Sequence, residues 1–471
     1  MKGMFRAVSL LVFILLFSIF AGCSSTLPPS ASHPITLPAV SDNGEKQIAL
    51  TATQQIAQAL DAGQFEAIVS LMEPGLQRKV DAAQLQAGWE SQGAPLGRVV
   101  SFGDSGAKKQ KGYITVQLLC QHEQGQSVLT CTFNAQMLLS GIYIKAVSSQ
   151  GLETTELSLP QGAMEKDVVL HQGSEMELPG KLVLPQGANA STPVVIFVQG
   201  SGSSDMDETI GPNKPFRDMA YGLAQGGIAS LRYDKLPYAH PELFTQPDMT
   251  VELEYTVTLQ EALRFLRETQ ELGPAYLAGH SLGGMLTPYL MEKSEGGFAG
   301  GILLAGSPRK LWEISYSQNL AILAGLPQEQ QAQAQAQIQS ELEKAQRLST
   351  MTAEQALGTT IFGMPGAYLQ HLEGIDAVAL AKENGLPLLI LQGEADFQVT
   401  MEEDFSAWQA ALNDMGNLVS YHSYPGLSHL FMPAPQEASI QNVQEAYLQP
   451  GYVDEQVISD MVDWILSIQQ Q

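Results

Sequence analysis

Basic residues are scarce in this chain of 471 residues, which has 24 Lys and Arg against 49 Asp and Glu and a formal net charge of −25. Beyond the first six residues the sequence contains no extended basic block. Because binding to nucleic-acid phosphates needs clustered Lys and Arg, the composition argues against nucleic acid as a partner. A hydrophobic content of 44% excludes a disordered or collagen-like chain, and the length predicts two or three domains, or one large domain with an attachment.

Cysteine is also rare. The three cysteines are Cys23, Cys120 and Cys131, and the sequence has no CxxC, HExxH or paired-histidine spacing, which argues against a metal site or a cysteine nucleophile. Cys120 and Cys131 stand on either side of Gln124-Gly125-Gln126, within an alternating pattern from Tyr113 to Leu139 that predicts two strands. We therefore predict a hairpin in which the two thiols face each other and form a disulfide, with two inert buried thiols as the alternative.

The apolar run from Ala7 to Ala21 is shorter than the roughly 20 residues that a membrane-spanning helix needs. It follows Lys2 and Arg6 and ends on small residues before Cys23, which is the layout of a cleaved secretory signal. The five residues ending at Cys23, IFAGC, resemble the bacterial lipoprotein box, although Phe20 stands where that box usually has Leu. The resemblance implies that Cys23 is lipidated and that the chain is exported, lipid-anchored to the bacterial cell membrane and facing outside the cytoplasm. An ordinary signal with an incidental cysteine is the alternative.

Composition and patterning divide the rest of the chain. We expect a signal peptide (1–22), a Pro/Ser-rich tether (23–46), a small α+β accessory domain (47–150) and a catalytic domain (151–471) with a helical cap at about 308–384. In the accessory domain, predicted helices at 54–72 and 81–90 precede the strand pair. This domain resembles a domain of unknown function that is often found ahead of exported bacterial hydrolases. The resemblance rests on two helices, the string GWESQGAPLGRV and a hairpin, and we assign the domain no role.

Short apolar runs alternate with helical segments after residue 151, which is typical of a parallel sheet covered on both faces. The runs are Val194–Val198, Ile228–Arg232, Ala275–Gly279, Gly301–Ala305 and Leu386–Leu391. The alternation stops between the last two runs, where a Gln/Ala-rich helix is predicted from 328 to about 348. A segment of this length predicts a folded cap rather than an open loop.

A GxSxG motif follows one of these buried runs. In Gly279-His280-Ser281-Leu282-Gly283, the serine stands between a predicted strand and an apolar helix that begins near Met285. A sharp turn at this point forces the serine into a strained conformation with its hydroxyl exposed, and side chains at the flanking glycines would collide with neighbouring backbone. The context predicts that Ser281 is a nucleophile.

A serine hydroxyl needs a base, and the base needs an orienting acid, in the chain order Ser, acid, His. Asp396 follows the run ending at Leu391, and His429 follows a predicted strand at 418–423, so both lie in loops at the expected edge of the sheet. We predict that Ser281, Asp396 and His429 form a catalytic triad, with Glu394 as the rival acid.

The oxyanion of a tetrahedral intermediate needs backbone N–H donors that are fixed in advance. One candidate is the amide of Leu282, directly after the nucleophile. The second should come from the loop after the first central strand, Gln199 to Asp205, where small residues allow close approach. We predict Ser201 as this donor, with Gly202 as the alternative.

Four strings of this sequence together resemble the α/β-hydrolase superfamily, in its esterase and serine-aminopeptidase-like branch. They are FVQGSGSSDMDETIGPNKPFRDMAYGLAQGGIASLRYDK, LAGHSLGGML, LQGEADFQVT and YPGLSHLFM. The resemblance covers Gly151 to about Gln469 and implies a mostly parallel sheet, helices on both faces and a helical cap. It also implies that Ser281 is the nucleophile, His429 the general base and then acid, and Asp396 its partner. Two departures concern the substrate side: Gln199 stands where many members have His, and Leu236-Pro237 where relatives often carry Arg-Gly.

These features predict a membrane-tethered serine hydrolase, a carboxylesterase that cleaves small to medium acyl esters through an acyl-enzyme. A serine aminopeptidase-like peptidase is the main alternative, in which an acidic cap residue such as Glu313, Glu341 or Glu343 binds a free amine. An acyltransferase, a thioesterase and a non-catalytic binding protein remain further alternatives. No metal or organic cofactor is required, because the polypeptide supplies every group of the mechanism.

Overall fold

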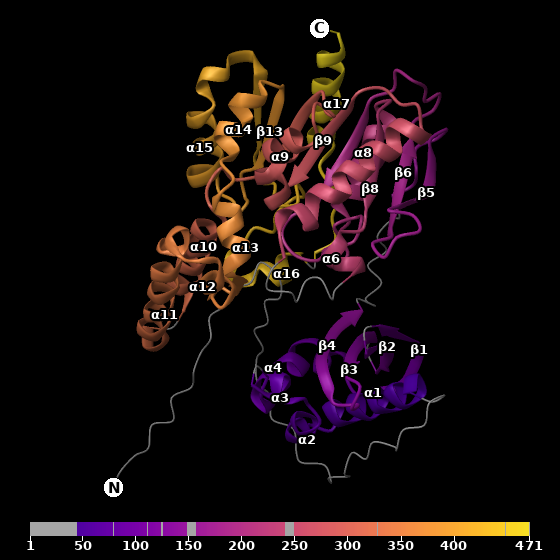
Figure 1. Cartoon of the computed structure of the whole chain (residues 1–471), viewed down its shortest axis with the longest axis vertical. Helices are drawn as coiled ribbons and strands as arrows, with labels where there is room; N and C mark the ends of the chain where they lie inside the picture. Colours follow the sequence, from indigo (N-terminus) through magenta and orange to yellow (C-terminus); the bar gives the residue numbers. More distant parts are fainter. Residues whose placement is uncertain are drawn as a thin grey trace. The chain divides into compact units, whose positions relative to one another are not determined.

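The computed structural model describes residues 45–78, 80–110, 112–123, 126–147, 157–240, 249–326, 328–447 and 449–470. These residues form two compact units, 45–147 and 157–470 (Figure 1). The predicted signal peptide and Cys23 lie outside the described residues. Among the helices of the described ranges, none is both long and apolar enough to cross a membrane.

The smaller unit combines short helices with a four-stranded antiparallel sheet in the order β1-β2-β3-β4. Its elements are α1 (Glu45–Asp61), α2 (Phe65–Ser70), α3 (Pro74–Gln77), α4 (Ala82–Gln92), η1 (Ala94–Leu96), β1 (Val99–Gln110), β2 (Tyr113–His122), β3 (Gln126–Phe133) and β4 (Leu139–Val147). The helix predicted over 54–72 is interrupted at Gly63, whose φ of 68° a helix does not accommodate. Ile56, Val116 and Leu129 are fully buried between the helices and the sheet and contribute to one core.

The predicted disulfide is wrong, because Cys120 and Cys131 are both free and buried. The antiparallel register pairs Cys120 with Ser127 and Cys131 with Val116. The two cysteines therefore stand four residues apart along the ladder, which is about 13 Å at the rise of a strand, whereas a disulfide needs Cα atoms within about 7 Å. Burial raises the pKa of the Cys120 thiol to about 11 and raises that of Cys131 further.

The larger unit is built on an eight-stranded sheet in the order β14-β13-β10-β9-β7-β8-β6-β5. The strands are β5 (Met164–Leu170), β6 (Leu178–Leu184), β7 (Val194–Val198), β8 (Ala229–Tyr233), β9 (Ala275–His280), β10 (Gly300–Leu304), β13 (Leu388–Gly393) and β14 (Val419–Tyr424). The six strands from β14 to β8 are parallel, and β6 and β5 extend the sheet antiparallel. Each of the five predicted apolar runs forms one of the parallel strands.

Helices cover both faces of this sheet. Strand β7 shows why: Val194 and Ile196 contribute to one core, and Val195 and Phe197 to the other. α8 (Val257–Thr269), α9 (Leu282–Lys293) and α14 (Ala377–Asn384) pack on the first face, and α5 (Pro215–Gln225) and α17 (Glu455–Gln469) on the second. The remaining short elements are α6 (Leu236–Ala239), the π-helical turns η2 (Glu252–Thr256) and η4 (Met401–Phe405), α15 (Ser406–Ala411), η5 (Asn413–Leu418), η6 (Ile440–Asn442) and α16 (Val443–Tyr447).

A helical insertion follows β10. It contains α10 (Leu311–Gly325), α11 (Gln328–Gln346), η3 (Leu348–Thr350), α12 (Ala353–Leu357), a two-residue strand pair β11 (Thr360–Ile361) and β12 (Met364–Pro365), and α13 (Gly366–Glu373), before α14 returns to the sheet. Figure 1 shows α10 to α13 gathered at one end of the unit, beyond the strands. The Gln/Ala-rich helix α11 buries Ala334, Ile338 and Ala345 along one side, so this insertion is a packed cap.

Candidate active site

Ser281 occupies a strained turn between β9 and α9. Its φ of 52° and ψ of −115° lie in a region that side-chain-bearing residues rarely adopt, and its amide donates to the Leu304 carbonyl at 2.8 Å. A Cβ on Gly279 would lie 2.2 Å from the Gly283 carbonyl oxygen, and one on Gly283 would lie 2.5 Å from the Val198 oxygen. The turn therefore requires both flanking glycines, as the sequence motif predicts.

Asp396 and His429 meet in the loops that follow β13 and β14. The Nδ1 atom of His429 lies 2.6 Å from Oδ2 of Asp396, and both side chains are buried. The Asp396 carboxylate also accepts hydrogen bonds from the Gln392 side chain at 3.0 Å and from the amides of Gln398 and Val399 at 2.7 and 3.0 Å. These donors fix the carboxylate against His429. By contrast, the rival acid Glu394 is exposed, and its carboxylate accepts from the Ser423 hydroxyl.

The loop that carries the predicted oxyanion donor lies beside Ser281, the predicted nucleophile. A Cβ on Gly200 would lie 3.0 Å from the Cβ of Ser281, so this loop passes in contact with the serine. Leu282 is the first residue of α9, and its N–H has no partner within the helix. Among the described residues, the amide of Ser201 also donates to no acceptor. Both predicted amides are therefore free to bind an oxyanion.

Two buried side chains that sequence reasoning missed tie these loops together. Glu208 accepts the Gly200 N–H at 2.6 Å, and its other oxygen lies 3.0 Å from Nδ1 of His280. The Nε2 atom of His280 lies 2.9 Å from the His429 carbonyl oxygen. Burial lowers the pKa of His280, but the Glu208 carboxylate, the His429 carbonyl and the Asp396 carboxylate all raise it, and the net pKa is raised. The sequence placed His280 next to the nucleophile, but no local signal linked it to residues so far along the chain.

Comparisons with known proteins agree with this geometry. Residues 215–435 match the family described as "Serine aminopeptidase, S33", and residues 53–142 match the family described as "Protein of unknown function (DUF3887)". Esterase EstD of Thermotoga maritima is 29% identical over 415 residues, which cover 87% of this chain and 93% of that protein. The chain is therefore similar to α/β-hydrolases. The predicted resemblance and the predicted fold class are confirmed, and the matches support hydrolase activity.

Two solved esterase structures align with this chain at lower similarity. Est1E from Butyrivibrio proteoclasticus has a TM-score of 0.40 and 16% identity, over 65% of this chain and 99% of that chain. The Pyrococcus furiosus esterase Pf2001 has a TM-score of 0.38 and 15% identity, over 64% of this chain and 91% of that chain.

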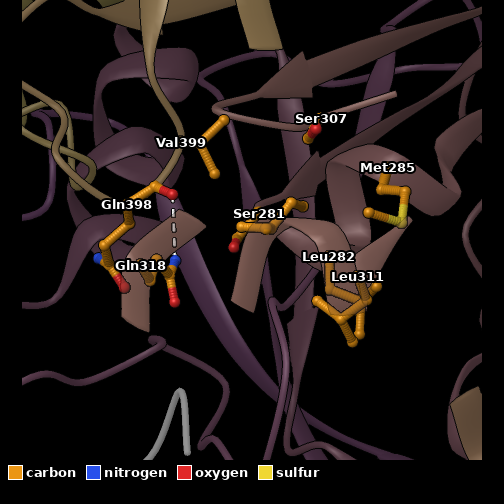
Figure 2. Close-up of a pocket in the computed structure, with 9 residues that line it drawn as sticks. Ser281, Leu282, Met285, Ser307, Leu311, Gln318, Gln398 and Val399 are labelled. Atoms are coloured by element: carbon orange, nitrogen blue, oxygen red, sulfur yellow. Dashed lines mark hydrogen bonds between the residues drawn. The ribbon is translucent and has the colours of Figure 1, made fainter. Parts of the chain in front are cut away.

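A hollow of about 280 Å³ opens at Ser281. Figure 2 shows Ser281 near the centre of the residues that line it. The lining is mostly apolar and comprises Leu282, Met285, Leu311, Ile314 and Val399, with Ser307, Gln318 and Gln398 as its other polar members. Gln318 of the cap donates to the Gln398 carbonyl at 3.0 Å and so joins the cap to the loop that carries Asp396 (Figure 2).

A second hollow of about 370 Å³ adjoins the first, since Met285 and Leu311 line both. Its one lining carboxylate, Glu373, pairs with Lys310 at 2.8 Å and accepts from the Trp312 ring at 3.0 Å. Met285 and Leu311 therefore lie where the two hollows adjoin.

The acidic cap residues proposed for binding an amine do not line either hollow. Glu341 is buried, where it accepts the Phe362 amide and pairs with Lys344. Glu313 accepts the Lys310 amide at the start of α10, and Glu343 is exposed on α11. Within the described ranges, no group of three His, Cys, Asp or Glu side chains could hold a metal ion.

Proposed function

We propose that this α/β-hydrolase is a carboxylesterase that acts through an acyl-enzyme on Ser281. The observation that carries the proposal is the 2.6 Å hydrogen bond between Asp396 and His429, which lie on the loops that follow β13 and β14. Ser281 lies in a strained turn at the same edge of the sheet. This arrangement supplies a nucleophile, a base and an orienting acid in the required chain order.

In the proposed acylation step, the Ser281 Oγ attacks the ester carbonyl carbon while Nε2 of His429 takes the hydroxyl proton. The carbonyl oxygen becomes an oxyanion, which the amides of Leu282 and Ser201 bind. Collapse of this intermediate breaks the bond to the alcohol oxygen, which receives the proton from His429. Water then repeats the sequence on the acyl-enzyme and releases the acid. Asp396 accepts the hydrogen bond from Nδ1 of His429 and stabilises the imidazolium.

The lining of the hollow favours an ester over a peptide with a free amino terminus. An aminopeptidase needs an acidic group near the nucleophile to pair with the substrate ammonium, since an unpaired buried charge is costly. The residues around Ser281 are apolar or neutral, and Glu313, Glu341 and Glu343 lie outside the lining. The similarity to a protein named as an esterase supports the same choice.

The test uses the purified full chain, with Ser281→Ala as the blank, on a series of nitrophenyl acyl esters beside aminoacyl anilides. We expect ester turnover that Ser281→Ala abolishes and anilides that stay intact. Anilide cleavage faster than ester cleavage would assign the site to a peptidase. Full ester turnover by Ser281→Ala would overturn the assignment of the nucleophile.

The membrane tether is a separate proposal that rests on the sequence around Cys23. We propose that lipidation of Cys23 holds the enzyme at the membrane surface. Labelling with a tagged fatty acid in a bacterial host tests it: the wild-type chain should take up label, and Cys23→Ala should not.

A further inference from the structure

The carbonyl oxygen of Gly200 accepts hydrogen bonds from two buried side chains. The Lys235 ammonium donates to it at 2.5 Å, and the Tyr255 hydroxyl donates to it at 2.8 Å. A carbonyl oxygen has two lone pairs, so these two donors saturate it. Gly200 lies in the loop that passes against Ser281, so the two side chains act on the backbone next to the proposed nucleophile.

Lys235 is held so that all three of its ammonium protons have acceptors. Besides Gly200, the Nζ atom contacts the Tyr255 hydroxyl at 2.6 Å and the Glu254 carboxylate at 2.5 Å. Only 1% of Lys235 is exposed. Burial lowers the pKa of the Lys235 ammonium group, and the nearby Glu254 carboxylate opposes that shift. The partners can satisfy an ammonium but not a neutral amine, which would have to place its lone pair against an acceptor.

Three elements hold the cluster of Lys235, Glu254 and Tyr255 in place. Glu254 and Tyr255 are neighbours in the π-helical turn η2, and Tyr368 of the cap helix α13 donates to the second Glu254 oxygen at 2.5 Å. Lys235 stands between β8 and α6. Two elements of the core and one of the cap therefore fix the position of the ammonium group.

The peptide group that receives these hydrogen bonds is the one that carries the Ser201 N–H. In a trans peptide the N–H points opposite to the C=O, so the Ser201 N–H points away from Lys235 and Tyr255. Hydrogen bonds to the oxygen of a peptide also polarise its N–H and make it a stronger donor. The preceding N–H, that of Gly200, donates to Glu208 at 2.6 Å, so the loop is also held directly before this peptide.

We propose that Lys235 and Tyr255 are positioning residues for the oxyanion site: they hold the Gly200–Ser201 peptide by its oxygen, so that its N–H is oriented and polarised toward the reacting carbonyl oxygen. This inference rests on the proposed serine-hydrolase function and deepens it. It assigns catalytic importance to a buried ion pair that would otherwise serve stability alone.

Tyr255→Phe tests the proposal by removing one donor to Gly200 and no carbon atom. Lys235→Met removes the other donor. The matched control is Tyr289→Phe, since Tyr289 is also buried and its hydroxyl donates to a carboxylate, that of Glu252, away from the Gly200 loop. Each variant of the full chain is compared in four measurements: the labelling rate of Ser281 by a fluorophosphonate, kcat and KM for a nitrophenyl ester, inhibition by a trifluoromethyl ketone, and the thermal midpoint.

We expect Tyr255→Phe to lower kcat and the fluorophosphonate labelling rate about 5- to 10-fold, with KM within about twofold, because an oxyanion contact acts in the transition state. The affinity for the trifluoromethyl ketone, which forms a tetrahedral oxyanion adduct on serine, should fall by the same factor. Lys235→Met should lower the same quantities about 100-fold. Tyr289→Phe should match the wild-type enzyme in all of them.

Unchanged labelling and unchanged ketone affinity in Tyr255→Phe would overturn the proposal, and so would a loss of activity that follows only the folded fraction. If Lys235→Met does not fold, Tyr255→Phe alone decides. The labelling rate does not depend on the substrate, so the failure of the esterase proposal is distinguishable: Ser281 would label normally in the wild-type chain while no ester is turned over.

Discussion

The imidazole of His280 donates its Nε2 proton to the backbone carbonyl of His429, 2.9 Å away, because a carbonyl oxygen can only accept. Its Nδ1 atom lies 3.0 Å from a carboxylate oxygen of Glu208, which forms an ion pair with the ring when the ring is protonated. The residue before the proposed nucleophile therefore holds the backbone of the proposed base, and its charge depends on Glu208.

A pH dependence of stability follows from this pair. Burial disfavours the charged form of His280 and Glu208 favours it, and the net pKa of His280 is raised. Stability from the pair is therefore complete below the unfolded-state pKa near 6.5 and is lost as pH rises through the higher folded-state pKa. Thermal midpoints measured from pH 6 to 9 should fall more steeply for the wild type than for Glu208→Gln, whose amide can donate to a neutral His280. Parallel slopes would contradict the assignment.

The two candidate acids can be separated by one matched pair of amide substitutions. Asp396→Asn keeps the shape of the side chain but places an amide where Nδ1 of His429 needs an acceptor, so we expect kcat to fall about a thousandfold. Glu394→Gln changes an exposed carboxylate bonded to Ser423 and should leave kcat within about twofold. Steady-state kinetics on one nitrophenyl ester decide between them. The reverse ranking would make Glu394 the acid.

Met285 sets the expected limit on acyl-chain length, because it lines both hollows. Met285→Ala should join them and raise kcat/KM for an eight-carbon acyl ester about 10-fold relative to a four-carbon ester, since burial of about two of the four extra methylenes, at about 0.8 kcal/mol each, gives that factor. Met291→Ala on the same helix is the control, because Met291 is also buried and lines neither hollow. An equal shift in both variants would trace the effect to general loosening of α9.

Asp234 should make the enzyme less stable at neutral than at acidic pH. Burial raises the pKa of this carboxyl to about 6, although the Met206 N–H at 2.8 Å opposes the shift. The contribution of the protonated Asp234 carboxyl to the free energy of unfolding is therefore complete below the unfolded-state pKa near 3.9 and is lost as pH rises through about 6. Asp234→Asn keeps an acceptor for Met206 and should raise stability at pH 7 by about 2 kcal/mol. The temperature at which ester hydrolysis is lost, measured at pH 4.5 and 7, checks this. A variant that is no more stable than the wild type at pH 7 would contradict it.

The sequence predicted the features that depend on local patterns. Buried apolar runs such as 194–198 form central strands. The glycines on either side of Ser281 lie so close to neighbouring backbone that neither position has room for a side chain, as the motif predicts. The contacts of Glu208 and Lys235 with Gly200 could not be predicted, because they depend on how distant loops pack and leave no periodic signal. The cysteine pairing failed for a related reason: the register of β2 and β3 decides it, and a strand pattern does not show its register.

The two free cysteines of the smaller unit also bear on how the protein can be produced. Thiol exchange requires the thiolate, and burial keeps the pKa of both thiols well above neutral pH, so neither exchanges readily with glutathione or another small thiol. Folding of this unit therefore calls for no oxidant and no disulfide isomerase. Preparations should tolerate strong reductants without losing structure, which makes expression in a reducing cytoplasm a practical route to the enzyme.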